Sequence, residues 1–164
     1  MIALARIDER LVHGQVLVGW VPHLGARRVV VADDEAAASP LARAAMTLAL
    51  PPGVEAEVEP IGSVDWAGLA RSAEPVLVVL RGIAAAERAL AAGLTPERSP
   101  VLNVGNLHYA GGRRAITPSV FLSGVELEGL RRLAAAGFQV EVRAVPLDAP
   151  VGLAEIERRW GAAG

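Results

Sequence analysis

A short segment near the N-terminus concentrates residue types that can bind and transfer a phosphoryl group. The segment Arg6–Val16 reads RIDERLVHGQV and holds two arginines, two carboxylates, a glycine and a histidine. An imidazole nitrogen can act as a nucleophile, and the guanidinium fork of arginine matches the oxygens of a phosphate. We therefore take His13 as the candidate nucleophile of a phosphoryl-transfer site.

The position of His13 along the chain supports this interpretation. The segment follows an apolar run, Ile2–Ala5, and precedes a helical stripe formed by Leu17, Trp20, Val21 and Leu24. His13 is therefore expected in a strand-to-helix turn, where free backbone N–H groups and the positive dipole end favour an anion. Gly14 would let the backbone approach that anion closely. The alternative is an ordinary surface or capping histidine.

The neighbours of His13 have two interpretations each. Asp8 is placed to orient the imidazole by accepting a hydrogen bond from its other N–H. Arg6 and Arg10 are candidate phosphate partners, with Gly14 and Gln15 at the helix start in the same group. Alternatively, Arg6 is a solvated strand end, and Asp8 and Arg10 pair with each other to hold the turn.

The apolar pattern predicts a single α/β domain over residues 1–164, with a doubly wound, mostly parallel sheet and helices on both faces. Continuous apolar runs indicate strands covered on both sides, at Ile2–Arg6, Arg28–Ala32, Pro75–Leu80 and Pro100–Val104. The alternating run Gln139–Arg143 predicts a half-exposed strand near a sheet edge.

Helical stripes lie between and after these strands. One stripe (Leu41, Ala44, Ala45, Leu48) begins at Ser39-Pro40, which suit the N-cap and first turn. Two more end at glycines: Ile83, Ala86 and Leu90 before Gly93, and Leu127, Leu130, Leu133 and Ala134 before Gly137. The last helix carries Leu153, Ile156 and Trp160 on one face.

The carboxyl ends of parallel strands gather at one edge of an open α/β sheet, where ligands bind. Asp33, Asp34, Asn103 and Gly105 follow or end such strands and are expected to form the pocket wall beside His13. The acidic run Asp33–Glu35 could bind Mg²⁺, although hydrogen bonding at a helix start is the favoured interpretation. The segment Asn103–Asn106 is too short for a nucleotide-binding glycine fingerprint, and its alternative is a plain turn.

The bulk composition narrows the class of protein. The chain has 164 residues, an apolar fraction of 52%, no cysteine and a net charge of −2. These values argue against disorder, a disulfide scaffold, thiolate metal sites and nucleic acid as the main partner. No apolar run reaches the roughly 20 residues that span a bilayer, and no secretory signal is evident. A cytoplasmic protein is expected.

The loop segment and four further blocks together resemble one protein family. RIDERLVHGQV is similar to the signature of the IIB subunits of the mannose/fructose/sorbose family of the phosphoenolpyruvate-dependent sugar phosphotransferase system. The blocks VVVADDEAA, PPGVEAEV, NVGNLHYAGGRRAITPSV and GFQVEVRAVPLD follow in the family's order. Five blocks in order cover nearly the whole chain.

The resemblance implies that His13 accepts a phosphoryl group on Nδ1 from a phosphorylated IIA domain. It further implies transfer to a hexose presented by the membrane subunits IIC and IID, a peripheral association with that permease, and no metal or other cofactor. A homodimer is left open, because family members are often dimeric or fused to IIA. A regulatory phosphoacceptor without sugar transport is the main alternative. A Rossmann-like nucleotide module is disfavoured, because the first turn lacks a glycine-rich loop.

Overall fold

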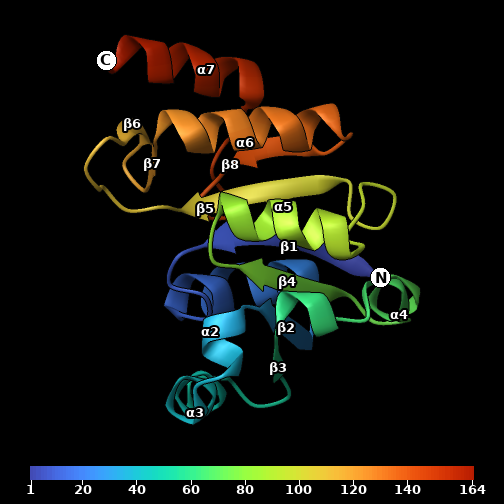
Figure 1. Ribbon diagram of the computed structural model, residues 1–164. Coiled ribbons are helices and arrows are strands. Elements are labelled where there is room, and N and C mark those ends of the chain that lie inside the picture. The colour runs from blue at the N-terminus through green and yellow to red at the C-terminus, as the bar shows by residue number, and fades with distance from the viewer.

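A computed structural model describes all residues from 1 to 164 and shows a twisted seven-stranded sheet between two helical layers (Figure 1). The strand order is β3-β2-β4-β1-β5-β8-β9, and only the short β9 is antiparallel to its neighbour. The strands are β1 (Ile2–Asp8), β2 (Arg28–Ala32), β3 (Glu55–Glu59), β4 (Val76–Leu80), β5 (Val101–Asn106), β8 (Gln139–Val142) and β9 (Val151–Gly152). The predicted fold class is confirmed.

Helices cover both faces of the sheet, as a doubly wound topology requires. One face packs against η1 (Val16–Trp20), α1 (Val21–Leu24), α2 (Asp34–Ala37) and α3 (Pro40–Leu48). The other packs against the 3₁₀ turn η2 (Ile61–Ser63), α4 (Trp66–Arg71), α5 (Ile83–Ala92), α6 (Gly124–Ala135) and α7 (Leu153–Ala162). None of these helices combines the length and the apolar character needed to cross a lipid bilayer.

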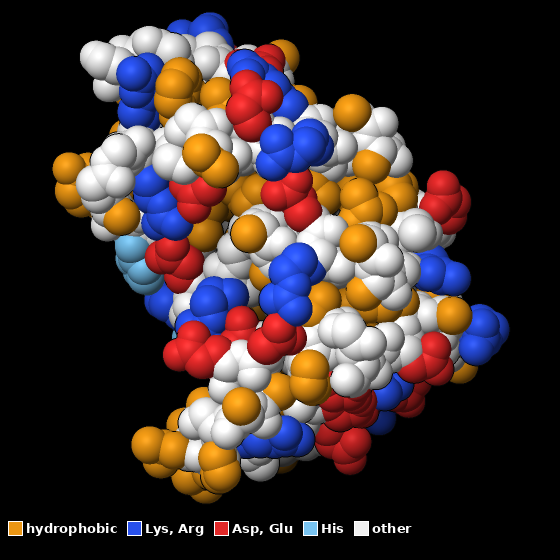
Figure 2. Space-filling model, in the orientation of Figure 1, with side chains coloured by type: hydrophobic (Ala, Val, Ile, Leu, Met, Phe, Trp, Pro, Cys, Tyr) orange, Lys and Arg blue, Asp and Glu red, His pale blue; other side chains and the backbone are white.

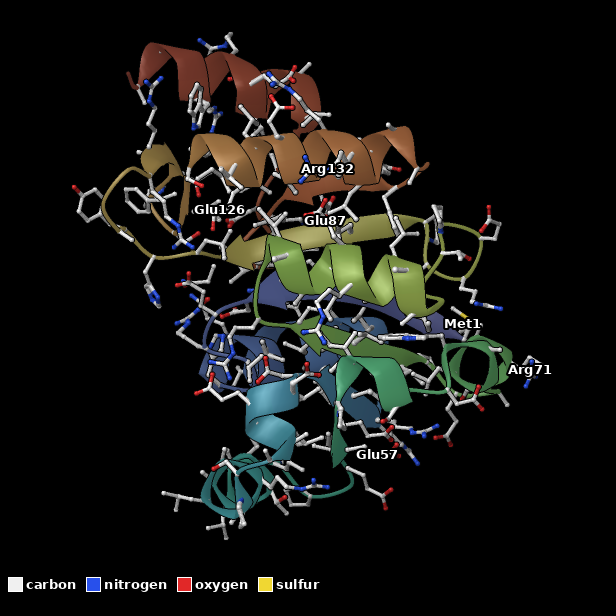
Figure 3. The ribbon with its side chains drawn as sticks, in the orientation of Figure 1. Met1, Glu57, Arg71, Glu87, Glu126 and Arg132 are labelled. Carbon is white, nitrogen blue, oxygen red and sulfur yellow. The ribbon has the colours of Figure 1, made fainter.

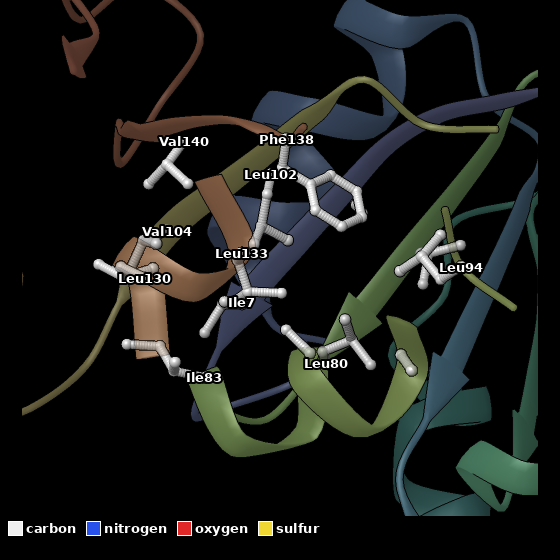
Figure 4. Close-up of a cluster of buried hydrophobic side chains, with 14 of the residues drawn as sticks. Ile7, Leu80, Ile83, Leu94, Leu102, Val104, Leu130, Leu133, Phe138 and Val140 are labelled. Carbon is white, nitrogen blue, oxygen red and sulfur yellow. The ribbon is translucent and has the colours of Figure 1, made fainter. Parts of the chain in front are cut away.

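The core on the α5 and α6 side supplies much of the buried apolar surface. Ile7, Leu80 and Leu102 are fully buried on adjacent strands and meet Leu130 and Leu133 of α6 (Figure 4). The central strand β4 has no exposed residue, because both of its faces are covered. This packing holds the carboxyl ends of β1, β4 and β5 in fixed positions, and those ends carry the candidate site.

The helix α3 begins as expected but presents its apolar stripe to solvent. The Ser39 hydroxyl caps it by accepting from the Ala42 N–H, and Pro40 occupies its first turn. Met46 is its one buried side chain, whereas Leu41 and Leu48 are 81% and 87% exposed. The stripe was therefore correct as a helical signal and wrong as a guide to the buried face.

The predicted edge strand also differs from expectation. The strand β8 lies next to the edge, which the two-residue β9 occupies, and Glu141 on β8 is buried. The position near the sheet edge is confirmed, but the half-exposure is wrong, because Val140 and Val142 pack in the core on one face and Glu141 accepts from the buried Asn103 on the other. A two-stranded hairpin of β6 (Arg114–Thr117) and β7 (Val120–Leu122) was not predicted from the sequence.

Candidate active site

The site loop connects the end of β1 to the first helical segment. The Leu11 N–H donates to the Asp8 carbonyl at 2.9 Å, and Leu11 has a φ of 57°, a strained value for a leucine. Leu11 and Val12 are buried and anchor the loop against the helices below it. His13 comes directly before the helical turn, and its carbonyl accepts from the Leu17 N–H at 3.0 Å. The loop is thus rigidly held although it lies at the surface.

The imidazole of His13 is oriented by the carboxylate of Asp8. The distance from His13 Nε2 to Asp8 Oδ2 is 2.8 Å, and the His13 side chain is 16% exposed. The Gln15 N–H donates to His13 Nδ1 at 3.3 Å. An ionised carboxylate only accepts, so Nε2 carries the proton and Nδ1 keeps a lone pair. The nucleophilic nitrogen therefore faces the helix start, away from Asp8.

Asp8 is completely buried, and all of its hydrogen-bond partners are donors. Its Oδ2 accepts from Arg6 Nη2 at 3.0 Å as well as from His13, and its Oδ1 accepts from the Arg10 N–H at 3.0 Å. Burial by itself raises the pKa of Asp8, but the hydrogen bond from His13 and the charge of Arg6 outweigh it. The pKa of this carboxyl group therefore lies below its ordinary value.

A fully buried arginine braces Asp8 from behind. Arg6 Nη1 donates to Asn103 Oδ1 at 2.8 Å and to the Arg143 carbonyl at 3.2 Å, while Nη2 reaches Asp8. The Asn103 amide nitrogen donates in turn to Glu141 Oε1 at 3.1 Å, also within the core. Burial lowers the pKa of the Arg6 guanidinium, and the neighbouring carboxylate opposes this shift. Arg6 is thus neither a solvated strand end nor exposed to a ligand.

Gly105 makes room for the Arg6 guanidinium. A Cβ atom at this glycine would lie 2.0 Å from Arg6 Cζ, far inside van der Waals contact. The Arg6 guanidinium also lies over the indole ring of Trp20, with Cζ 5.4 Å from the ring centroid. Asn103 and Gly105 were expected to line an open pocket, but both are buried behind Arg6. Their observed contacts support Asp8 from inside the protein.

Arg10 lies on the solvent side of the loop and contacts residues before and after His13. Its Nε lies 3.4 Å from Asp8 Oδ1, and its Nη2 donates to Gln15 Oε1 at 2.9 Å. The Arg10 side chain keeps 34% of its surface exposed, so it can exchange these contacts for those of a ligand. Apart from its chain neighbours His13 and Gln15, a Cβ atom at Gly14 would meet no protein atom within 4 Å, so no other element covers the loop at this residue.

A hollow of about 320 Å³ adjoins the loop on the α3 side. It is lined by loop residues Glu9, Arg10, Leu11 and Val12, by Arg81, and by Ala36, Ala42, Ala45 and Met46. The loops after β1, β2 and β4 therefore share a shallow surface, as the parallel sheet predicts. The loop after β5 lies outside this hollow.

The acidic residues after β2 have structural partners. Asp33 caps α2 by accepting from the Ala36 N–H at 2.9 Å and binds Arg81 through two hydrogen bonds of 2.9 and 2.7 Å. Asp34 accepts from the Ile61 N–H and from Arg88. Their oxygens thus serve helix capping and ion pairing, the interpretation favoured from the sequence, and no cluster of metal-binding side chains is present.

A second network, which sequence reasoning missed, ties the loop after β5 to the site loop. Glu9 accepts from the His108 N–H and from His108 Nδ1, both at 2.9 Å, and from Arg113 Nη1 at 2.7 Å. Arg113 also binds Glu126, which completes the capping box of α6. Figure 3 shows Glu126 near the β6–β7 hairpin. The only sequence signal was the charge of these residues, whose separation of about a hundred positions hides the contact.

Taken together, the chain combines a doubly wound sheet with a histidine oriented at a helix start, an arrangement that could carry a group on the imidazole. The model of the PTS system sorbose subfamily IIB component matches residues 2–160. The chain therefore belongs to this family of IIB components of the sugar phosphotransferase system.

Individual relatives and solved structures agree with this assignment. The chain is 35% identical over 153 residues to the N-acetylgalactosamine-specific phosphotransferase enzyme IIB component 2 of Escherichia coli, covering 93% of this chain and 96% of the relative. It is 32% identical to the mannose-specific EIIAB component of the same species, covering 90% of this chain and 46% of the relative. The crystal structure of the IIBSor domain of the sorbose permease from Klebsiella pneumoniae superposes with a TM-score of 0.84 at 25% identity, covering 96% and 97% of the two chains.

Proposed function

We propose that this protein is a phosphocarrier that accepts a phosphoryl group on His13 Nδ1 and passes it to a sugar during uptake. The single observation that carries the proposal is the pairing of Nε2 with the buried carboxylate of Asp8 at 2.8 Å. This contact leaves Nδ1 as the unprotonated nitrogen at the helix start, where it accepts from the Gln15 N–H. Family membership supplies the reaction class.

The first transfer, from the donor to His13, requires no proton to be gained or lost by this protein. The lone pair of His13 Nδ1 attacks phosphorus, the P–N bond of the donor phosphohistidine breaks, and the donor nitrogen keeps the electron pair. The proton on Nε2 stays hydrogen-bonded to Asp8, which stabilises the positive charge that develops on the ring. In the second transfer a sugar hydroxyl attacks phosphorus and releases its proton to water, while the P–N bond breaks and Nδ1 recovers its lone pair.

Arg10 and the helix start are the groups that can bind the transferred phosphoryl oxygens. The Arg10 guanidinium is partly exposed, and the Gln15 N–H points toward Nδ1. At Gly14 no residue other than its chain neighbours would contact a side chain, so no other part of the protein covers the loop there. Arg6 acts indirectly in this scheme, by holding Asp8.

The partners follow from the family. We propose that a IIA domain supplies the phosphoryl group, and that the membrane subunits IIC and IID present a hexose for the second transfer. The mannose-specific EIIAB relative is consistent with a close relation between A and B components. In this scheme the protein works in the cytoplasm, at the inner face of the permease. A regulatory phosphoacceptor is the second candidate, and the same His13 chemistry would serve it.

Incubation with phosphoenolpyruvate and the upstream phosphocarriers tests the proposal. Intact-mass spectrometry should show one acid-labile phosphoryl group on the wild-type protein and none on His13→Ala, while His108→Ala serves as the control and keeps the group. Phosphate uptake by His13→Ala at the wild-type level would contradict the assignment. Sugar phosphorylation after addition of membranes that contain IIC and IID separates transport from a purely regulatory role.

A further inference from the structure

An apolar helix face adjoins the site loop and has no partner within the chain. Leu41, Ala45 and Leu48 follow one another along α3, and the two leucines are 81% and 87% exposed. Figure 2 shows hydrophobic side chains gathered over α3 at the lower left, below a band of charged side chains. Large apolar side chains are rarely left bare in pairs without a binding partner.

This face is continuous with the site. Ala42, Ala45 and Met46 of α3 line the hollow of about 320 Å³, which the site-loop residues Glu9–Val12 also line, directly before His13. A partner of standard size covers about 800 Å² of each surface, which corresponds to a disc with a radius of about 16 Å. A partner of this size that reaches His13 and extends over the hollow would also contact the helix that borders it.

We infer that the Leu41–Leu48 face of α3 is the docking surface for the IIA phosphodonor. The inference rests on the proposed function, because it assumes that a protein delivers the phosphoryl group to His13. Two leucines and a shallow hollow suit a partner that must leave after each transfer, since lasting interfaces are larger and more apolar.

The charges around α3 favour a water-soluble partner over the membrane surface. The helix carries a single basic residue, Arg43, and the preceding α2 begins with Asp34 and Glu35. The hollow adds Arg81, which is paired with Asp33, and Arg10, which contacts Asp8 and Gln15. A surface that approaches anionic lipid headgroups normally carries a cluster of lysines or arginines. The α3 face therefore lacks the charge pattern of a lipid-facing surface, which favours the water-soluble donor as its partner.

The test compares a double variant with a matched control. Leu41→Gln/Leu48→Gln removes the apolar face and keeps good helix formers. Val125→Gln makes the same kind of change at a residue that is 78% exposed on α6, over the opposite face of the sheet. Each protein is phosphorylated by two donors: the IIA component of the source organism below saturation, and phosphoramidate, which is too small to dock.

We expect transfer from IIA to the double variant to fall roughly 10- to 100-fold, because two apolar contacts are lost. The Val125→Gln control should stay within about twofold of wild type, as should phosphoramidate transfer to all three proteins. An unchanged rate from IIA would overturn the inference. So would a defect confined to sugar phosphorylation by the membrane subunits, or a wild-type dimer that the double variant dissociates in sedimentation.

A measurement on the unaltered protein decides the case if the double variant also reacts slowly with phosphoramidate. Titration of ¹⁵N-labelled protein with IIA should shift the amide signals of Leu41, Ala45 and Leu48 together with that of His13. The signal of Val125 should stay in place. Unmoved α3 signals in a complex that shifts His13 would refute the docking surface. If wild-type protein accepts phosphate from neither donor, the proposed function itself is wrong.

Discussion

A single methyl group at Gly105 should disable the site without touching His13. The Cβ atom of Gly105→Ala would lie 2.0 Å from Arg6 Cζ, and the Arg6 side chain is fully buried, so it cannot move aside at low cost. Displacing it would lengthen the bonds of 3.0 Å to Asp8 and 2.8 Å to Asn103. Asp8 would then lose the charge that opposes its own burial.

The magnitude follows from two contributions. Overpacking of a well-filled core costs about 1–3 kcal/mol, and loss of one partner of a buried ion pair costs about 3–5 kcal/mol. Because the two share one displacement, we expect a total of about 3–5 kcal/mol rather than their sum. At about 2–4 °C per kcal/mol for a domain of this size, the melting temperature should fall by roughly 6–20 °C.

The assay measures melting and phosphoryl transfer on the same samples. Transfer from IIA, measured at least 15 °C below the lowest melting temperature, should fall by roughly 10- to 100-fold because Asp8 no longer fixes the imidazole. Gly161→Ala on α7 is the matched control: its Cβ atom would meet open space, so stability should hold or rise. Wild-type melting and wild-type transfer in Gly105→Ala would refute the argument that Arg6 must stay where it is.

Three further predictions address neighbouring groups. Arg10→Ala should slow transfer into and out of the site by roughly 10- to 150-fold with the fold intact, and Arg10→Lys should recover only part of it; wild-type rates for Arg10→Ala would leave only a bracing role. The pKa of Asp8 is lowered on folding, so its contribution to stability is present above its ordinary value of 3.8 and is lost as the pH falls below it. Thermal melts from pH 5 to pH 2 should therefore show a smaller acid loss in Asp8→Asn than in wild type, and equal losses would contradict the assignment. Asp33→Asn should cost about 1–2 kcal/mol by weakening the α2 cap and the Arg81 pair, yet leave the transfer rate within about twofold; a large rate loss would return Asp33 to the site.

The sequence alone predicted four of the central strands, most of the longer helices and the place of His13 before a helix. Continuous apolar runs predicted β1, β2, β4 and β5 to within two residues at their ends, because strands buried on both faces leave a local pattern. The capped start of α3 and the glycines after α5 and α6 are equally local signals. The placement of His13 before a helix followed from the same reasoning, since strand, turn and stripe are adjacent in the chain.

Tertiary structure alone decided what supports the histidine. The contact of Arg6 with Asn103 spans 97 positions, and that of Asn103 with Glu141 spans 38, so no local pattern reports them. Only the strand order brings β1, β5 and β8 side by side, which turns an apparent strand-end arginine into a buried brace. The outward face of α3 has the same cause: periodicity marks an apolar stripe, but the packing of the neighbouring elements decides whether the protein or a partner covers it.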